Sequence, residues 1–202
     1  LVRRLGSART IALGLSVVAL LLGVIGHMEP GTSYLYLGAV LFLTGFGVGT
    51  AFVPATDTVM GAVPQANAGL ASAINDAGRQ VGAALGIAVL GALTNAAYTA
   101  GIAGPASRLS TDLGTLVRAS AGAALQLADQ IGGPGGDAMR EAVTAAFTDG
   151  FRLAMLAGAG MMAAGAILIL RHLPSRDVAF YDAASTQAGA AVTLKDDDGL
   201  AQ

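Results

Sequence analysis

Four long stretches of the chain carry apolar side chains at nearly every position, and shorter polar segments separate them. The apolar stretches cover approximately residues 11–27, 34–54, 69–98 and 151–171. Each is close to the roughly 20 residues that a helix needs to cross the hydrocarbon core of a bilayer. Backbone groups inside lipid must be hydrogen-bonded within the segment, so we expect each stretch to be a helix. The pattern predicts an all-α integral membrane protein with four transmembrane helices, the second of which ends at Pro54.

The polar segments give the expected organisation around a transmembrane region of residues 11–172. Residues 1–10 are expected to be a cytoplasmic loop, and residues 173–202, rich in Ala, Ser and Asp, a disordered cytoplasmic tail. Residues 99–150 lack a core pattern, which favours a partly helical outer loop lying on the bundle over a separate domain. Apolar residues recur there at helical spacing: Leu113, Leu116, Val117, Ala124, Leu125 and Ile131.

The positions of the arginines predict the orientation in the membrane. Cytoplasmic flanks of membrane helices are enriched in Lys and Arg. Arg3, Arg4 and Arg9 precede the first stretch, and Arg171 and Arg176 follow the fourth. We therefore expect a multi-pass protein of the cytoplasmic membrane with both ends of this chain in the cytoplasm.

The amino-acid composition argues against several classes of function for this chain. Of the 202 residues, 54% are hydrophobic and only 12% are charged, about half the charged fraction of a soluble domain. The net charge of −2 offers no basic stripe for nucleic acid. The chain has no Cys and only two isolated His, so we expect no metal centre and no cofactor. The interiors of the apolar stretches hold no carboxylate or His, which argues against a membrane-embedded enzyme.

A polar group at the start of the third stretch is the first candidate site. Asn75, Asp76 and Arg79 precede a long run without charge. On a helical wheel Gly78, Gly82 and Gly86 form one stripe, with Asn75 and Arg79 on the same side and Asp76 about 60° beyond Arg79. Small residues mark close helix approaches in membranes, so this side is expected to face protein or a cavity. Arg79 is placed to pair with Asp76. Three roles stay open for this polar group: it could form a helix interface or gate, anchor the helix at the membrane interface, or contact substrate or protons.

A second glycine face lies on the second stretch. Gly38, Gly45, Gly49, Phe52 and Thr56 share a sector about 60° wide. Tight helix packing is the expected role. The alternative is a glycine-lined wall of a substrate path, where Thr44 and Thr50 supply hydroxyl groups.

Together these segments resemble a known family. The stretch from 45 to 93 is similar to the late helices of the fourteen-helix drug:proton antiporter branch of the major facilitator superfamily, and the resemblance covers residues 1 to about 172. It is carried by the G-x-G-x-G run before Pro54, by Val63-Pro64, by Arg79-Gln80-Val81-Gly82, by Leu85-Gly86-Ile87-Ala88 and by Asp149-Gly150-Phe151-Arg152.

The resemblance implies the C-terminal portion of a proton-coupled secondary transporter that exports amphipathic small molecules by alternating access. The four helices would be the last of the bundle, and their partners would be the lipid bilayer, the N-terminal helices of the same transporter, the substrate and protons. In that family the coupling carboxylate usually lies in the N-terminal part. Two alternatives stay open: a free-standing four-helix scaffold or accessory subunit, and a truncated, non-functional transporter.

Overall fold

The computed structural model describes residues 5–29 and 31–173, and these are helical apart from short connections. Four helices are long and apolar enough to cross a membrane, which confirms the predicted number. They are α2 (Ser7–Gly26), α3 (Tyr34–Gly61), α4 (Ala68–Ala106) and α7 (Gly133–His172). The turn between α3 and α4 holds the short 3₁₀ helix η1 (Gln65–Asn67), and two short helices, α5 (Thr111–Ala119) and α6 (Ala121–Ile131), join α4 to α7. Arg3, Arg4, Arg176 and the tail predicted after residue 173 lie outside the described residues.

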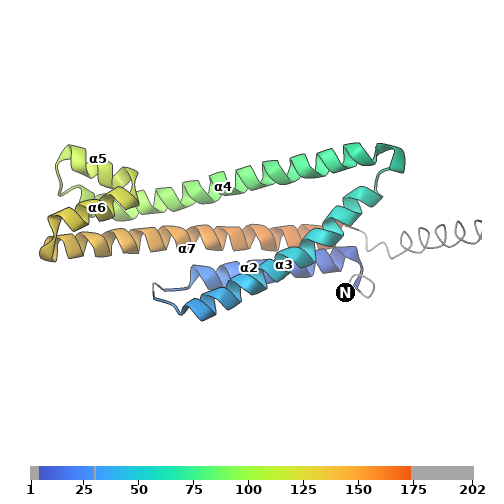
Figure 1. Ribbon diagram of the computed structural model, residues 1–202, viewed down its shortest axis with the longest axis horizontal. Coiled ribbons are helices and arrows are strands. Elements are labelled where there is room, and N and C mark those ends of the chain that lie inside the picture. Colours follow the sequence, from blue (N-terminus) through green and yellow to red (C-terminus); the bar gives the residue numbers. More distant parts are fainter. Residues whose placement is uncertain (1–4, 30, 174–202) are drawn as a thin grey trace, which may run out of the picture.

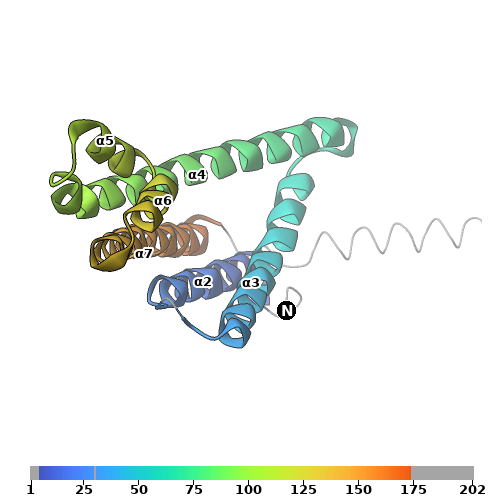
Figure 2. The same cartoon turned by 60° about the vertical axis from the view of Figure 1, so that its left-hand side comes forward.

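The long helices are arranged around α7. The half of α7 that ends at His172 packs on α2, α4 approaches α7 from about Leu90 onward and diverges from it toward Ala68, and α3 packs mainly on α2 (Figure 1). The other half of α7 runs beyond the ends of α2 and α3 and lies beside the end of α4, where α5 and α6 cover the pair. Figure 2 shows that α4 and α3 diverge from their shared turn. The bundle is therefore well packed along α7 and open between α3 and α4.

The helices extend further than the apolar stretches predicted. α3 does not end at Pro54: it continues through this residue to Gly61. Proline removes one backbone donor, but membrane helices tolerate it when neighbours satisfy the freed groups. Pro54 lies buried inside the helix, and the backbone group that it leaves without a donor is the Thr50 carbonyl oxygen four residues earlier. The prediction that α3 stops here was wrong.

The segment from 99 to 150 also differs from the expected loop. α4 runs on to Ala106 and α7 begins at Gly133, so most of the segment belongs to long helices. Gly132 and Gly133 have φ of 61° and 55°, a left-handed conformation that glycine adopts without strain, and they separate α6 from α7. With 39 and 40 residues, α4 and α7 are roughly 60 Å long, about twice the hydrocarbon thickness.

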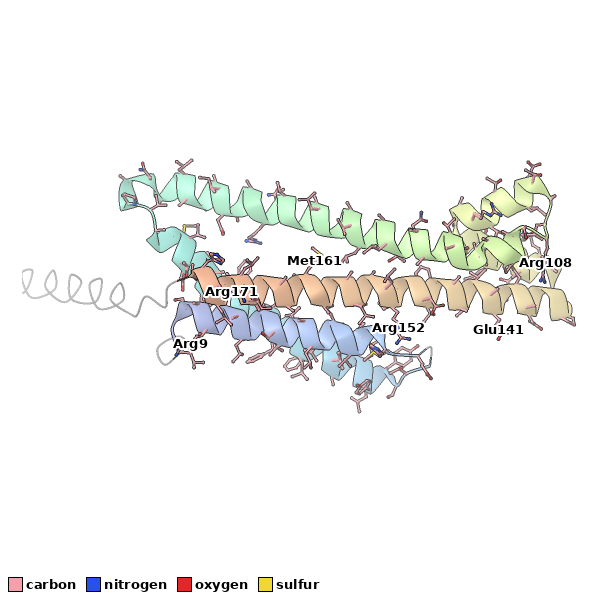
Figure 3. All side chains as sticks on the ribbon, turned by 180° about the vertical axis from the view of Figure 1, so that it is seen from behind. Arg9, Arg108, Glu141, Arg152, Met161 and Arg171 are labelled. Carbon is pink, nitrogen blue, oxygen red and sulfur yellow. The ribbon has the colours of Figure 1, made fainter. Side chains whose placement is uncertain are left out.

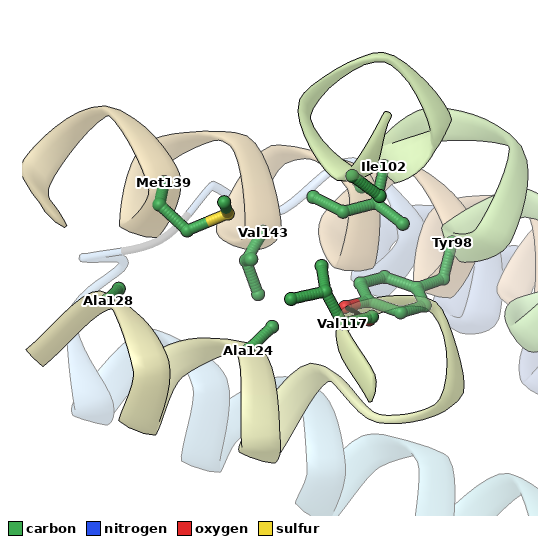
Figure 4. Packing of buried hydrophobic residues seen from close by; sticks show 9 residues of the cluster. Tyr98, Ile102, Val117, Ala124, Ala128, Met139 and Val143 are labelled. Atoms are coloured by element: carbon green, nitrogen blue, oxygen red, sulfur yellow. Dashed lines mark hydrogen bonds between the residues drawn. The ribbon is translucent and has the colours of Figure 1, made fainter. Parts of the chain in front are cut away.

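The segment from 99 to 150 has a hydrophobic core of its own, which the sequence analysis missed. Tyr98 and Ile102 of α4, Val117 of α5, Ala124 of α6 and Val143 of α7 are each at most 3% exposed and pack together (Figure 4). The Tyr98 hydroxyl donates to the Val117 carbonyl oxygen at 2.7 Å, and Arg140 pairs with Asp129 across α6 and α7. The expected apolar face is partly right: Val117 and Ala124 are buried, whereas Leu113, Leu116 and Ile131 are 38–47% exposed.

Glycines make the close contacts between the long helices. A Cβ atom added to Gly14 of α2 would lie 2.7 Å from backbone atoms of Gly47 and Ala51 in α3, and one added to Gly150 of α7 would lie 2.6 Å from the Thr94 carbonyl oxygen in α4. Lipid gives no hydrophobic drive for helix association, so contact depends on such close packing. These glycines fix how near the helices can approach.

The crossing of α4 and α7 generates a test of this packing. Gly150→Ala should lower the thermal unfolding temperature of the detergent-solubilised protein, because overpacking costs about 1–3 kcal/mol. Gly160→Ala is the matched control on the same helix, since no atom lies within 4 Å of its added Cβ. Equal unfolding temperatures for the two variants would contradict the close contact at Gly150.

Candidate functional site

The polar group expected at the start of the third stretch lies in the first three turns of α4. Asp76 and Arg79 are three residues apart on this helix and therefore neighbours on its surface. Arg79 Nη1 lies 3.4 Å from Asp76 Oδ1, with the two side chains 55% and 58% exposed. The predicted pairing of Arg79 with Asp76 is confirmed. Asn75 beside them is half-buried.

Arg79 also contacts α3, which the sequence analysis did not predict. Its guanidinium carbon lies 4.5 Å from the centroid of the Phe52 ring, within the distance of a cation–π interaction. Phe52 lies ten positions before Ala62, where the turn begins, and Arg79 lies eleven positions after Ala68, where α4 begins. At 1.5 Å per residue, the two side chains lie at matching heights of about 15–17 Å from the turn. Equal spacing from the turn is the signal in the sequence that could have found this pair.

The glycine stripe beside Arg79 lies open among the residues that the structure describes. No atom lies within 4 Å of a Cβ added to Gly78, Gly82 or Gly86. Gly78 and Gly82 are exposed and Gly86 is half-buried. Within the part of the chain that the structure describes, nothing covers this face. Its expected role in helix packing or gating therefore stays a prediction.

The glycine face predicted on α3 is also open. Gly45 and Gly49 have no atom within 4 Å of an added Cβ, whereas a Cβ added to Gly47 would lie 3.0 Å from the Val18 side chain of α2. The Thr44 and Thr50 hydroxyls each donate to the carbonyl oxygen four residues earlier, at 2.8 Å. These two side chains satisfy their own helix, which weakens the idea that they line a substrate path.

Charged side chains elsewhere gather toward the helix ends. Arg9 and Arg171 lie at one end of the bundle, and Arg108 and Glu141 lie near the other (Figure 3). On α7 no residue between Arg152 and Arg171 is charged, a length of about 27 Å, close to the thickness of the hydrocarbon core. Met161 lies in the middle of this uncharged length.

Two hollows of the described structure lie away from the polar group. A hollow of about 640 Å³ at the α2–α3 connection is lined by residues that include His27, Glu29 and Tyr36. A second of about 280 Å³ lies between α4, α7 and the α5–α6 junction. In residues 5–29 and 31–173 no three His, Cys, Asp or Glu side chains gather as a metal site would require. The chemistry that this geometry offers is charge pairing and helix contact rather than bond making.

Curated relatives of the chain are drug-resistance proteins. It is 28% identical over 162 residues to the methyl viologen resistance protein SmvA of Salmonella typhimurium, covering 80% of this chain and 32% of that protein. It is 40% identical over 93 residues to the multidrug resistance protein Stp of Mycobacterium tuberculosis, covering 46% of this chain and 17% of that protein. The multidrug efflux pump LfrA of Mycolicibacterium smegmatis is 34% identical over 83 residues, 41% of this chain and 16% of the pump.

The chain thus spans about a third or less of the length of these relatives. No protein-family profile and no solved structure matches it. The relatives are drug-efflux proteins and not enzymes, which confirms the expectation that this is not an enzyme. Together with four apolar helices, they indicate a multi-pass membrane protein related to drug-efflux transporters.

The open stripe of α4 generates a prediction for the protein in a cell membrane. Gly82 is exposed and a Cβ added to it has no atom within 4 Å among the described helices, but Gly82→Leu should reduce drug resistance several-fold if another helix packs there, because a large side chain blocks close approach. Ala84→Leu is the control: Ala84 is exposed and lies about 200° away around the helix. Drug tolerance and membrane abundance are measured together. Equal tolerance in both variants and wild type would argue against a packed stripe.

Proposed function

We propose that this chain forms the last four membrane helices of a proton-coupled secondary transporter that exports amphipathic drugs by alternating access. The observation that carries the proposal is the similarity to a methyl viologen resistance protein over 80% of the chain. The family inferred from the residues is the drug:proton antiporter branch of the major facilitator superfamily. Substrate and protons would be its transported partners.

The open helix faces support a larger assembly. Exposed large apolar side chains follow α3 and α4, among them Phe42, Phe46, Ile74 and Leu85, which are 61–76% exposed. In water such a surface would be unfavourable, whereas lipid or further helices would cover it. Because the glycine stripe of α4 is suited to a close helix contact, we assign that face to the N-terminal helices of the same transporter and the apolar rest to lipid.

The arrangement of charge supports an orientation with both ends of this chain in the cytoplasm. Arg9 and Arg171 lie at the same end of the bundle (Figure 3), as expected for a cytoplasmic side. In this orientation the turn between α3 and α4, with Asp76 and Arg79 near it, faces the cytoplasm. The helical segment built from α5, α6 and the adjoining ends of α4 and α7 would then project outward.

The positions of the carboxylates suggest which helices of the transporter would carry protons and which would form the inner gate. Asp57 and Asp76 belong to the turn-proximal ends of α3 and α4, and both are exposed. Neither is placed inside a long uncharged run, where a buried carboxylate would be expected to carry protons. We assign proton coupling to helices outside this chain, and a role in the inner gate to Asn75, Asp76, Arg79 and the adjacent glycines.

Resistance measured in cells tests this proposal. Cells that produce the intact protein should tolerate several-fold more methyl viologen than cells without it, and an uncoupler that dissipates the proton gradient should abolish the export. Arg79→Ala should lose most of this gain at normal membrane abundance, because the guanidinium ties Asp76 and Phe52 together.

Arg118→Ala is the control for loss of positive charge, since Arg118 is exposed on α5, away from the inner turn. Wild-type tolerance in Arg79→Ala would show that Arg79 is only an anchor. No difference between producing and non-producing cells would overturn drug export itself.

A further inference from the structure

Phe52 is the residue through which α3 holds the charged group of α4. α4 packs on α7 from about Leu90 onward, whereas it has few contacts with α3, and the two helices diverge from their shared turn (Figures 1 and 2). At about 15–17 Å from the turn, Arg79 still reaches the Phe52 ring, 4.5 Å from its centroid. Whatever moves α4 away from α3 must break this contact.

The electrostatics of the contact favour a ring over any other apolar partner. The face of an aromatic ring is negative and attracts a cation. Asp76 lies on the same helix as Arg79, so this pair at 3.4 Å cannot by itself connect α4 to α3. The ring is the partner on α3, and Asp76 fixes the direction in which the guanidinium points.

The site is partly shielded from solvent, which decides how strong the contact can be. Phe52 is 42% exposed and the Arg79 side chain 55% exposed. A cation–π contact shifts an equilibrium by about two- to five-fold when it is open to water and by about thirty-fold when it is desolvated. If further helices cover this face, the contact is desolvated and its effect on the equilibrium approaches the value of about thirty-fold.

We propose that Phe52 is a positioning residue of the inner gate: its ring holds the Arg79 guanidinium and so keeps α3 and α4 together in one conformational state. In the state where these helices separate, the contact is broken and Arg79 keeps only Asp76. This inference rests on the proposed transporter function, because it needs a cycle between two states. It adds a residue, Phe52, to the gate group of Asn75, Asp76 and Arg79.

A distance measurement tests the proposal without relying on transport. The chain has no cysteine, so spin labels can be attached to Val48→Cys in α3 and Leu85→Cys in α4, both exposed and beyond the contact as seen from the turn. The intact protein is placed in lipid nanodiscs in a background without other cysteines, and the interspin distance distribution is recorded. Wild type should show a short-distance population that represents the held state.

Substitutions at position 52 then separate ring electrostatics from packing. Mono-, di- and trifluorinated phenylalanine keep the size of the ring while removing its negative face. The ratio of short to long distances should fall stepwise, by about two- to thirty-fold in total. Phe52→Leu should match the trifluorinated ring, and Phe52→Trp should keep the short population. The control is the same fluorinated series at Phe46, an exposed α3 residue.

Two outcomes would overturn the proposal. A fluorinated series that leaves the ratio unchanged would mean that Arg79 only packs on the ring. An equal response at Phe46 would mean that fluorination acts through the helix surface in general. Failure of the proposed transporter function would be recognised separately. In that case the wild-type protein would export no drug, but the distance ratio would still respond stepwise to fluorination, and only the proposed transport cycle would be contradicted.

Discussion

Close approach of helix backbones at glycine is the constraint on which the packing of this chain depends. Inside a bilayer the hydrophobic effect does not drive helices together, so association depends on van der Waals contact at short range. α7 uses Gly150 to meet Thr94 of α4, and α2 uses Gly14 to meet Gly47 of α3 and Gly26 to meet Met155 of α7. Any larger side chain at these points would push the helices apart.

A second set of glycines has no neighbouring helix among the described residues, and the proposed gate is based on the difference between the two sets. Gly78, Gly82 and Gly86 on α4 and Gly45 and Gly49 on α3 face open space. Between these helices the described contact far from the turn is that of Arg79 with Phe52. α3 is held firmly on α2 and α4 on α7, whereas α3 and α4 have few contacts with each other. Such an arrangement is suited to a gate between α3 and α4, which is the role proposed here.

The number of spanning helices could be predicted from the sequence, because unpaired backbone groups are excluded from hydrocarbon and apolar runs of the right length must be helical. The helix ends could not. α4 and α7 continue beyond the membrane-length runs because tertiary packing around Ile102, Val117 and Val143 stabilises helix that hydropathy alone does not reveal. Pro54 was misjudged because membrane helices tolerate proline in their interior more readily than the local rule against it implies.

The candidate site was predicted only in part. The Asp76–Arg79 pair follows from helix geometry along one segment, and the structure confirms it. Which glycines touch another helix depends on which helices become neighbours, and a helical wheel of one segment holds no such information. Phe52 was placed on the glycine face of α3 and not beside Arg79, because that contact crosses the turn between two helices.

The account is tested most directly by asking what covers the glycine stripe of α4 in the intact protein. A single nitroxide label at Gly82→Cys is compared with one at Ala84→Cys, which points to the other side of the helix, about 200° away. Its collision rate with oxygen dissolved in the lipid is measured in membranes. The account predicts a several-fold lower rate at position 82 than at position 84, because other helices of the transporter shield the stripe. Equal or higher oxygen access at position 82 would mean that the stripe faces lipid, and would contradict the account.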